Sequence, residues 1–213
     1  SYETTKEIEE NGTYYISVKD AYEHITTKSI VIDKVDNIAP ILSDIQNSSN
    51  GAWAKSITLS WEITEEESGI AKVEYSTDNL KWIELSKEEW NGFTRNNERN
   101  DMLYIRVTDK VGNVSEIKST TMKIDNTIPS ATWNIGNNVY GNNGWYQSLS
   151  LQSTIKDSYG EINTVRYCTT TESTCTPGTN ASISNNTFTV TLGSNASPQK
   201  VCTEVIDKAG NTS

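Results

Sequence analysis

The chain has 213 residues, a formal net charge of -10 and one histidine, and 34% of its residues are hydrophobic. This length allows two small domains or one large one. The acidic balance excludes the basic surface that nucleic acids and anionic lipids require, and no apolar run reaches the roughly 18 residues of a membrane span. We therefore expect no nucleic-acid partner and no membrane insertion within these residues.

The first segment contains a phrase that returns twice further along the chain. It reads "YYISVKDAYEHIT" at 14–26, and its later copies read "LYIRVTDKVGNVS" at 103–115 and "VCTEVIDKAGNTS" at 201–213. The copies align Asp20, Asp109 and Asp207, which are 89 and 98 residues apart. Such a period is too long for a solenoid repeat and is typical of a chain of autonomous domains.

Residues 37–126 have the pattern of β-strands. In "SITLSWEI" (56–63), Ile57, Leu59, Trp61 and Ile63 alternate with polar residues and predict one buried strand face. The segments "KVEYS", "LYIRVTD" and "STTMKID" follow with the same period, separated by turn residues at spacings of about 8–12 residues. Only the stretch 86–93 is compatible with a helical turn. The sequence thus predicts an all-β fold of antiparallel β-sandwiches.

Residues 127–213 repeat this order of strands. The segment "NGWYQSLSLQSTI" (143–155) corresponds to "GAWAKSITLSWEI" (51–63), which places Trp145 at the position of Trp53. We therefore predict the last strands of a preceding repeat at 1–36, a sandwich domain at 37–126, and a sandwich domain lacking its last strand at 127–213. A missing strand predicts an open sheet edge, which a continuation of the chain or a neighbouring molecule would fill.

The repeated phrase is interpreted as a structural turn between two strands. Glycine and asparagine tolerate the positive φ of a tight hairpin, and the preceding aspartate can accept hydrogen bonds from backbone N–H groups across the turn. The following serine or threonine can do the same. In the first copy, Glu23 and His24 replace the Gly-Asn pair. The predicted turn residues are Asp109, Gly112, Asn113, Asp207, Gly210 and Asn211.

The order of these motifs resembles the bacterial immunoglobulin-like repeats of Gram-positive cell-surface and secreted proteins. The motifs are "NGWY", a "V-x-Y-S" strand, "D-K-x-G-N-x-S" and "I-D-x-x-x-P" at the junction, with Pro40 and Pro129 in equivalent positions. The resemblance covers nearly the whole chain. It implies tandem immunoglobulin-like or fibronectin-like sandwiches that serve as spacers or adhesins, sometimes beside glycoside-degrading enzymes.

Three cysteines, Cys168, Cys175 and Cys202, all lie in the segment 127–213. In a surface protein such cysteines can oxidise. We predict a Cys168–Cys175 disulfide, because a hairpin can bring together two cysteines that are seven residues apart. A Cys168–Cys202 disulfide across adjacent strands is the alternative. The absence of histidine from this segment argues against a catalytic thiol.

Metal sites have few candidates in the sequence. His24 stands alone, which is a poor basis for zinc or a catalytic triad, and the run Glu65–Glu67 indicates a solvated loop. We expect no cofactor. Calcium at the junctions between repeats is the alternative, because hard cations need converging carboxylates, although the chain lacks the dense Asp-x-Asp spacing of calcium loops. The carboxylates in question are Asp33, Asp36, Asp109 and Asp125.

Two aromatic residues, Trp90 and Phe93, lie in the polar, irregular stretch 86–101, which has no counterpart in 127–213. Aromatic side chains on a polar loop can stack on sugars or anchor a protein interface. They can equally close one end of a sandwich. Both interpretations are open at this point, whereas the alternation assigns Trp61 to the core.

No repeat combines a nucleophile, a base and an orienting group, so we predict that the chain is not an enzyme. The predicted function is that of a non-catalytic repeat region of an extracellular bacterial surface protein, which acts as a spacer or adhesive stalk beside neighbouring repeats. One alternative is a module that binds a host protein, such as an immunoglobulin, or a glycan. A second is an accessory region of a secreted glycoside-degrading enzyme.

Overall fold

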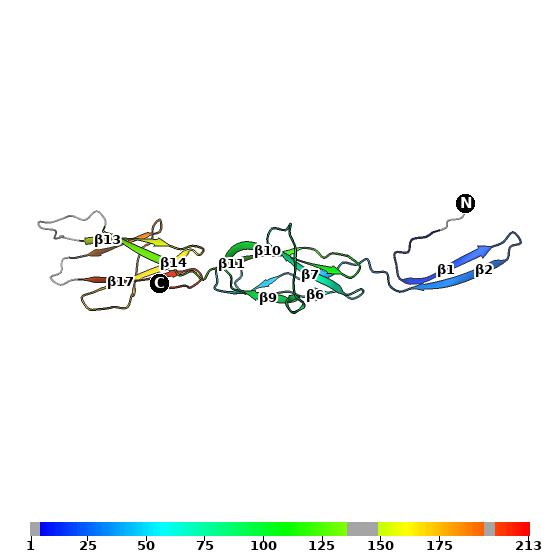
Figure 1. The fold of residues 1–213 in the computed structure, drawn as a ribbon, viewed down its shortest axis with the longest axis horizontal. Helices are drawn as coiled ribbons and strands as arrows, with labels where there is room; N and C mark the ends of the chain where they lie inside the picture. Colours follow the sequence, from blue (N-terminus) through cyan, green and yellow to red (C-terminus); the bar gives the residue numbers. More distant parts are fainter. Residues whose placement is uncertain (1–4, 136–148, 194–198) are drawn as a thin grey trace. The chain divides into compact units, whose positions relative to one another are not determined.

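The computed structural model describes residues 5–135, 149–193 and 199–213, and in these ranges the chain is all-β, as predicted (Figure 1). Among these residues the one helical element is a single 3₁₀ turn, Lys87–Glu89, and no helix is long and apolar enough to cross a membrane. The strands, in chain order, are β1 (Gly12–Lys19), β2 (Ile25–Ile32), β3 (Ile41–Leu42), β4 (Gln46–Asn47), β5 (Ile57–Ser60), β6 (Ile63–Thr64), β7 (Ile70–Ser76), β8 (Ile83–Glu84), β9 (Gly92–Arg95), β10 (Arg99–Asp109), β11 (Lys118–Ile124), β12 (Ser130–Ile135), β13 (Leu149–Lys156), β14 (Ile162–Thr170), β15 (Thr179–Asn180), β16 (Thr187–Leu192) and β17 (Lys200–Asp207).

The sheets combine consecutive strands with strands that are three or four elements apart in the chain. Strands β1 and β2 pair with each other, β3 pairs with β6, and larger sheets have the orders β4-β5-β9, β11-β10-β7-β8, β12-β13-β16 and β15-β14-β17. The chain forms two compact units. The first comprises Ser1–Ile45, Ser60–Gly92 and Leu103–Ser119, and the second comprises Gln46–Leu59, Phe93–Met102 and Thr120–Ser213. The domain boundaries 36/37 and 126/127 stay predictions.

The alternation in 56–63 marks buried positions, as predicted, for its first three members. Ile57, Leu59 and Trp61 are 0%, 1% and 3% exposed, whereas Ile63 is half-buried. The strand is not continuous, because β5 pairs within the β4-β5-β9 sheet and β6 pairs with β3. At this change of sheet the Trp61 indole N–H donates to the Trp90 carbonyl at 2.6 Å, which satisfies the polar end of a buried ring.

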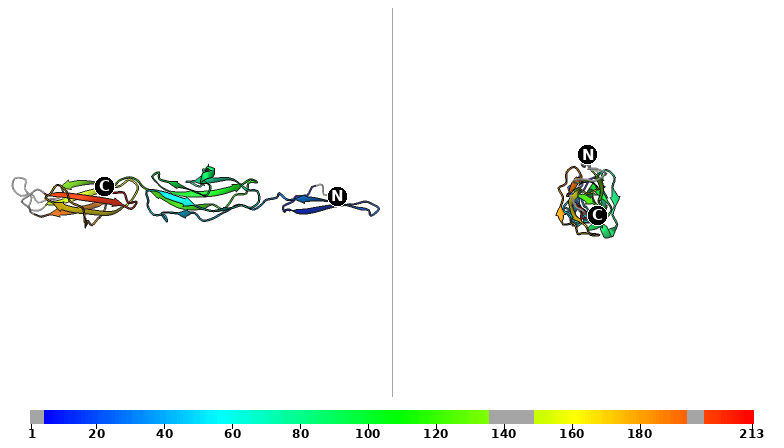
Figure 2. Two further views of the ribbon diagram at one scale, coloured as in Figure 1. Left: turned by 90° about the horizontal axis from the view of Figure 1, so that it is seen from below. Right: turned by 90° about the vertical axis from the view of Figure 1, so that its left-hand side faces the viewer.

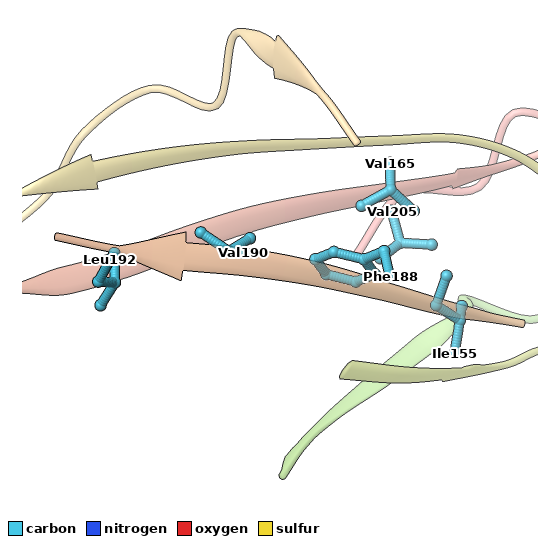
Figure 3. Close-up of a cluster of buried hydrophobic side chains, with 6 residues drawn as sticks. All are labelled: Ile155, Val165, Phe188, Val190, Leu192 and Val205. Carbon is cyan, nitrogen blue, oxygen red and sulfur yellow. The ribbon is translucent and has the colours of Figure 1, made fainter. Parts of the chain in front are cut away.

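A buried cluster in the second unit lies between two sheets (Figure 3). Phe188 and its alternate neighbours come from β16, and Ile155 comes from β13 of the same sheet, whereas Val165 and Val205 come from β14 and β17 of the other sheet. The Trp133 ring meets the Phe188 ring edge-on, with centroids 5.3 Å apart. Trp145, the predicted counterpart of Trp53, lies outside the described residues. Side chains from both layers thus share one core, which is the defining feature of a sandwich. The cluster consists of Ile155, Val165, Phe188, Val190, Leu192 and Val205.

The β1–β2 hairpin has an apolar face that the described residues leave uncovered. The register pairs Tyr14 with Ile30 and places Ile16 and Val18 on the same face. Ile16, Val18 and Ile30 are 65%, 66% and 54% exposed. The counterparts of Ile16 and Val18 in β10 are Ile105 and Val107, which are fully buried. The same strand pattern is therefore a core face in one copy and a solvent-exposed face in the other.

Strand β17, drawn in red in Figures 1 and 2, lies at the edge of its sheet. It pairs with β14 from Lys200 to Asp207. Its counterpart β10 has a neighbour on both sides, namely β11 and β7. Within the described part of the chain, the second edge of β17 pairs with no strand, although Ile206 and Thr212 form an isolated bridge and the Val205 carbonyl accepts from Ser213 N–H at 3.1 Å. An edge that is not paired along its length exposes backbone donors and acceptors.

The predicted Cys168–Cys175 disulfide is confirmed, with Cα atoms 6.2 Å apart. Cys202 is free and half-buried. It lies directly opposite Cys168 in the β14–β17 register, which is the geometry that made the alternative pairing plausible from sequence. The bridge closes the loop that follows β14.

Removing this disulfide is expected to destabilise the second unit by roughly 2–3 kcal/mol, because the unfolded chain regains the entropy of the open loop. The test is Cys175→Ser in a Cys202→Ser background, so that Cys168 cannot pair with Cys202 instead. Chemical denaturation compares it with Cys202→Ser alone. Equal unfolding free energies in these two variants would contradict the expectation.

A buried carboxylate on β7 is held by two cations. Glu74 is 7% exposed, and its oxygens accept from Lys72 Nζ and Arg106 Nε at 2.9 Å each. The Arg106 guanidinium also lies over the Trp82 ring, 4.1 Å from its centroid. Burial alone would raise the pKa of Glu74, but the hydrogen bonds and charges of Lys72 and Arg106 outweigh burial and lower that pKa below its ordinary value of 4.5.

Glu74→Gln is expected to destabilise the first unit by roughly 2 kcal/mol at pH 7, because two charge-assisted bonds are lost. A lowered native pKa stabilises the fold above the unfolded pKa, and this contribution disappears as the pH falls through the native pKa. The difference between the parent chain and Glu74→Gln should therefore vanish progressively below about pH 4.5. Denaturation at several pH values measures it. Glu116→Gln, a change at an exposed carboxylate, should match the parent throughout.

Candidate functional site

The candidate site lies at the repeated turn, where an aspartate is buried. Asp109 is 1% exposed, and its Oδ1 accepts from the backbone N–H groups of Val111, Gly112 and Asn113 at 2.7–2.9 Å. Burial alone would raise the pKa of Asp109, but the side-chain amide of Asn113 and these backbone donors outweigh it and lower the pKa. The carboxylate therefore remains ionised while it closes the turn.

The backbone of the turn requires a positive φ at one position. Gly112 and Gly210 have φ of +103° and +86°, and in the first copy Glu23 adopts +74°. The glycine of the Gly-Asn pair is therefore in the left-handed region and the asparagine is not, although both residue types tolerate a positive φ. In this first copy Asp20 Oδ1 accepts from the N–H groups of Tyr22 and His24 at 2.8 and 2.9 Å. The turn thus persists without its glycine.

The asparagine of the turn joins it to the segment that precedes each repeat. Asn113 Nδ2 donates to Asp109 Oδ2 at 2.7 Å and lies 3.4 Å from the carbonyl oxygens of Asp36 and Ile38. Asn211 Nδ2 donates to Asp207 Oδ2 at 2.8 Å and to the Asp125 carbonyl at 3.0 Å. Asp36 and Asp125 begin the equivalent segments "DNIAP" and "DNTIP". The repeated phrase therefore holds the incoming linker as well as turning the chain.

Two groups of three carboxylates form at the ends of these turns. The first trio is Asp36, Glu65 and Asp109, and the second trio is Asp125, Asp157 and Asp207; within each, one oxygen of every residue lies within 4.8 Å of the others. Asp33 belongs to neither trio and is exposed. Of the predicted calcium residues, Asp36 and Asp109 are thus brought together, whereas Asp125 joins Asp207 in place of Asp109.

The carboxylates of the first trio are supplied with backbone donors. Asp36 Oδ2 accepts from Ser68 N–H at 3.2 Å, and Glu65 Oε1 accepts from the N–H groups of Glu67 and Gly69 at 2.9 and 3.2 Å. Asp109 has the donors described above. Each carboxylate of the first trio thus has backbone hydrogen-bond donors.

Glu65 and Asp157 were missed as site residues by sequence reasoning. Glu65 lies in the loop before β7, "TEEESGI", and Asp157 lies in the loop before β14, "KDSYGEI". Aligning Gly69 with Gly160 would have placed a carboxylate shortly before each glycine. Glu65 and Asp157 were not predicted because strand periodicity does not indicate where the side chains of loop residues lie.

Trp90 and Phe93 are in packed positions. Phe93 is 8% exposed on β9, and Arg95 lies over its ring, 3.9 Å from the centroid. Trp90 is half-buried, and its indole N–H donates to the Leu85 carbonyl at 3.3 Å. These contacts are those of residues that close one part of a core. A role in ligand binding stays a prediction.

Comparison with known proteins gives structural matches only. No protein-family model and no curated protein sequence matches the chain. Fibronectin(III)-like modules of CbhA from Clostridium thermocellum match with a TM-score of 0.33 at 15% identity, covering 79% of this chain and 88% of that chain. Chitinase ChiA74 from Bacillus thuringiensis matches with a TM-score of 0.35 at 18% identity, covering 86% of this chain and only 27% of the chitinase chain. At these scores neither match assigns a function.

Gly112→Ala is expected to destabilise the first unit by about 1–3 kcal/mol, because alanine is strained at a φ of +103° even though no neighbouring atom would obstruct its Cβ. Val111→Ala, in the same turn and exposed, should change the unfolding free energy by less than about 0.5 kcal/mol. Denaturant titration compares the two variants. An equal effect of both would show that the glycine is not required for the turn.

Proposed function

We propose that this chain is a non-catalytic repeat region of a secreted or surface-attached bacterial protein, and that it holds other parts of that protein at a fixed spacing. The observation that supports this most directly is the bond from the turn asparagine to the linker. It occurs in two successive repeats, from Asn113 to the carbonyls of Asp36 and Ile38 and from Asn211 to the carbonyl of Asp125.

The linker segments are themselves restricted. Asp36 Oδ1 accepts from Ile38 N–H at 3.0 Å, and Asp125 Oδ1 accepts from Thr127 N–H at 2.9 Å, so each segment has the same local turn. Pro40 and Pro129 follow and fix one backbone dihedral each. A linker that is bonded at its start and restricted by proline has fewer conformations than a flexible connection. Such a linker suits a spacer.

The exposed face of the β1–β2 hairpin supports a further repeat before residue 37. Its apolar positions match those that are buried in β10. A two-stranded hairpin is marginally stable alone and needs a packed face. A preceding sandwich domain would supply that face, as expected if repeats follow one another along a longer protein.

A chain that holds other parts of a protein at a fixed spacing could also serve as an adhesin or as an accessory region of a glycoside-degrading enzyme. The residues that would bind a ligand, Trp90 and Phe93, have the packing contacts described above, which favours the spacer over a binding module. The disulfide is in keeping with an extracellular location.

The proposed role as a spacer is tested by measuring how widely the distance varies between two labels on either side of the linker 125–129. Spin labels at Lys81→Cys and Lys156→Cys, both exposed positions, in a Cys202→Ser background with EDTA present, should give one narrow distance distribution in double electron–electron resonance. Asn211→Ala should broaden it, because the bond to the Asp125 carbonyl is lost. Asn97→Ala, at an exposed asparagine, serves as the control and should leave it narrow.

A broad distribution in the parent chain would overturn the proposal of a held linker. Saturable binding of polysaccharides or serum proteins to the parent chain, lost in Trp90→Ala with the fold intact, would instead assign the chain an adhesive role.

A further inference from the structure

The second trio, Asp125, Asp157 and Asp207, carries three negative charges in one place. We propose that these three carboxylates bind a calcium ion, which joins the segment after β11 to the loop between β13 and β14 and to the turn after β17. One oxygen from each residue lies within 4.8 Å of the others. Oxygens that share a Ca²⁺ at roughly 2.3–2.6 Å can be no more than about 5 Å apart, so the spacing fits.

Two oxygens of the trio are buried without a hydrogen-bond partner. Asp125 is 0% exposed, and its Oδ2 receives no bond, although its Oδ1 accepts from Thr127 N–H. Asp157 Oδ2 is also buried and unpaired, although its Oδ1 accepts from Ser158 N–H at 2.6 Å. A buried carboxylate oxygen without a partner costs several kcal/mol unless a cation or donor meets it. These two oxygens therefore point to a missing positive ligand.

Both oxygens converge on Gly160. A Cβ at this residue would clash with Asp125 Oδ2 and would lie 3.2 Å from Asp157 Oδ2. Gly160 and Asp157 also line a hollow of about 330 Å³, which gives the site a path from solvent. The missing side chain thus leaves room where the two oxygens meet.

The first trio differs from the second, because none of its carboxylate oxygens is buried without a hydrogen-bond partner. At Gly69, the nearest atom to a Cβ would be Lys110 Nζ at 3.0 Å, and Gly69 N–H donates to Glu65. The counterpart of Lys110 is Lys208, but its Nζ is bound to Glu161 Oε2 at 2.5 Å. Asp109 pairs with Ile70 and Asp207 pairs with Ile162, so the first repeat has Gly69 where the second has Glu161. The lysine that lies over Gly69 in the first repeat thus has a counterpart that is bound to Glu161 in the second.

The charges of the second trio have no counter-charge among the described residues. Among the described residues, no ion pair includes Asp125, Asp157 or Asp207. Burial, together with the charges of Asp125 and Asp207, raises the pKa of Asp157 above its ordinary value. Mutual repulsion of this kind is relieved by a divalent cation. Hard carboxylate oxygens, with water in the remaining positions, are the ligands of calcium in extracellular modules, with Kd of about 0.1–1 mM.

The test is calorimetric titration of the full chain with CaCl₂ after treatment with EDTA. We expect about one ion per chain with a Kd of roughly 0.1–1 mM, and a rise in Tm of about 5 °C in 10 mM CaCl₂. Asp157→Asn should weaken binding at least about tenfold, because one charged ligand is lost. It should fold normally in EDTA, since it also removes a repelling charge. Glu65→Gln, the matched change in the first trio, should bind calcium like the parent.

Two results would overturn the proposal. One is the absence of binding by the parent chain up to 10 mM CaCl₂, a measurement that does not depend on any variant. The other is Asp157→Asn, shown to be folded by circular dichroism in EDTA, binding calcium as tightly as the parent.

Discussion

The buried aspartate at the start of each turn is the group on which the local structure depends. Asp109 and Asp207 are each 1% exposed, and a carboxylate at such a position must be surrounded by donors or by a cation. The donors come from the turn itself, which fixes the backbone of the following four residues. This backbone conformation also places the side-chain amide of Asn113 or Asn211 against a carbonyl oxygen of the linker. Through its hydrogen bonds, the buried carboxylate thus links the end of the strand, the turn and the incoming linker.

Much of this arrangement could be predicted from the sequence, because it is local. Alternation predicted that Ile57, Leu59 and Trp61 are buried, and the residue types of the repeated phrase predicted a turn closed by aspartate. The contact of Asn113 with the linker joins residues 77 apart and follows from no local pattern. The break between β5 and β6 could not be predicted either, because the alternation of apolar and polar residues continues where the strand changes from one sheet to another. Pairing of Cys168 with Cys175 in preference to Cys202 depends on side-chain geometry that strand register leaves open.

The two carboxylate trios show how one position can alter the electrostatics of a repeated site. Both repeats have a lysine after the turn aspartate, Lys110 in one and Lys208 in the other. Gly69 and Glu161 occupy the same position opposite this lysine. Lys110 lies over Gly69, which has no side chain, whereas Lys208 forms an ion pair with Glu161. An exposed ion pair contributes little stability by itself. Lys208, bound to Glu161, forms no ion pair with the three carboxylates of the second trio.

The β1–β2 hairpin shows that an alternating sequence pattern can form a strand without burying its apolar side. Its residues alternate as those of β10 do, and they form the same strand, followed by the same aspartate-closed turn, with Asp20 in place of Asp109. Alternation, however, specifies only which side of a strand is apolar. Burial of that side needs a second layer, and the described residues supply one to Ile105 and Val107 but not to Ile16 and Val18. Since apolar burial is worth about 25 cal/mol per Å², a strand of this kind gains most of its stability from its neighbour and little from its own pattern.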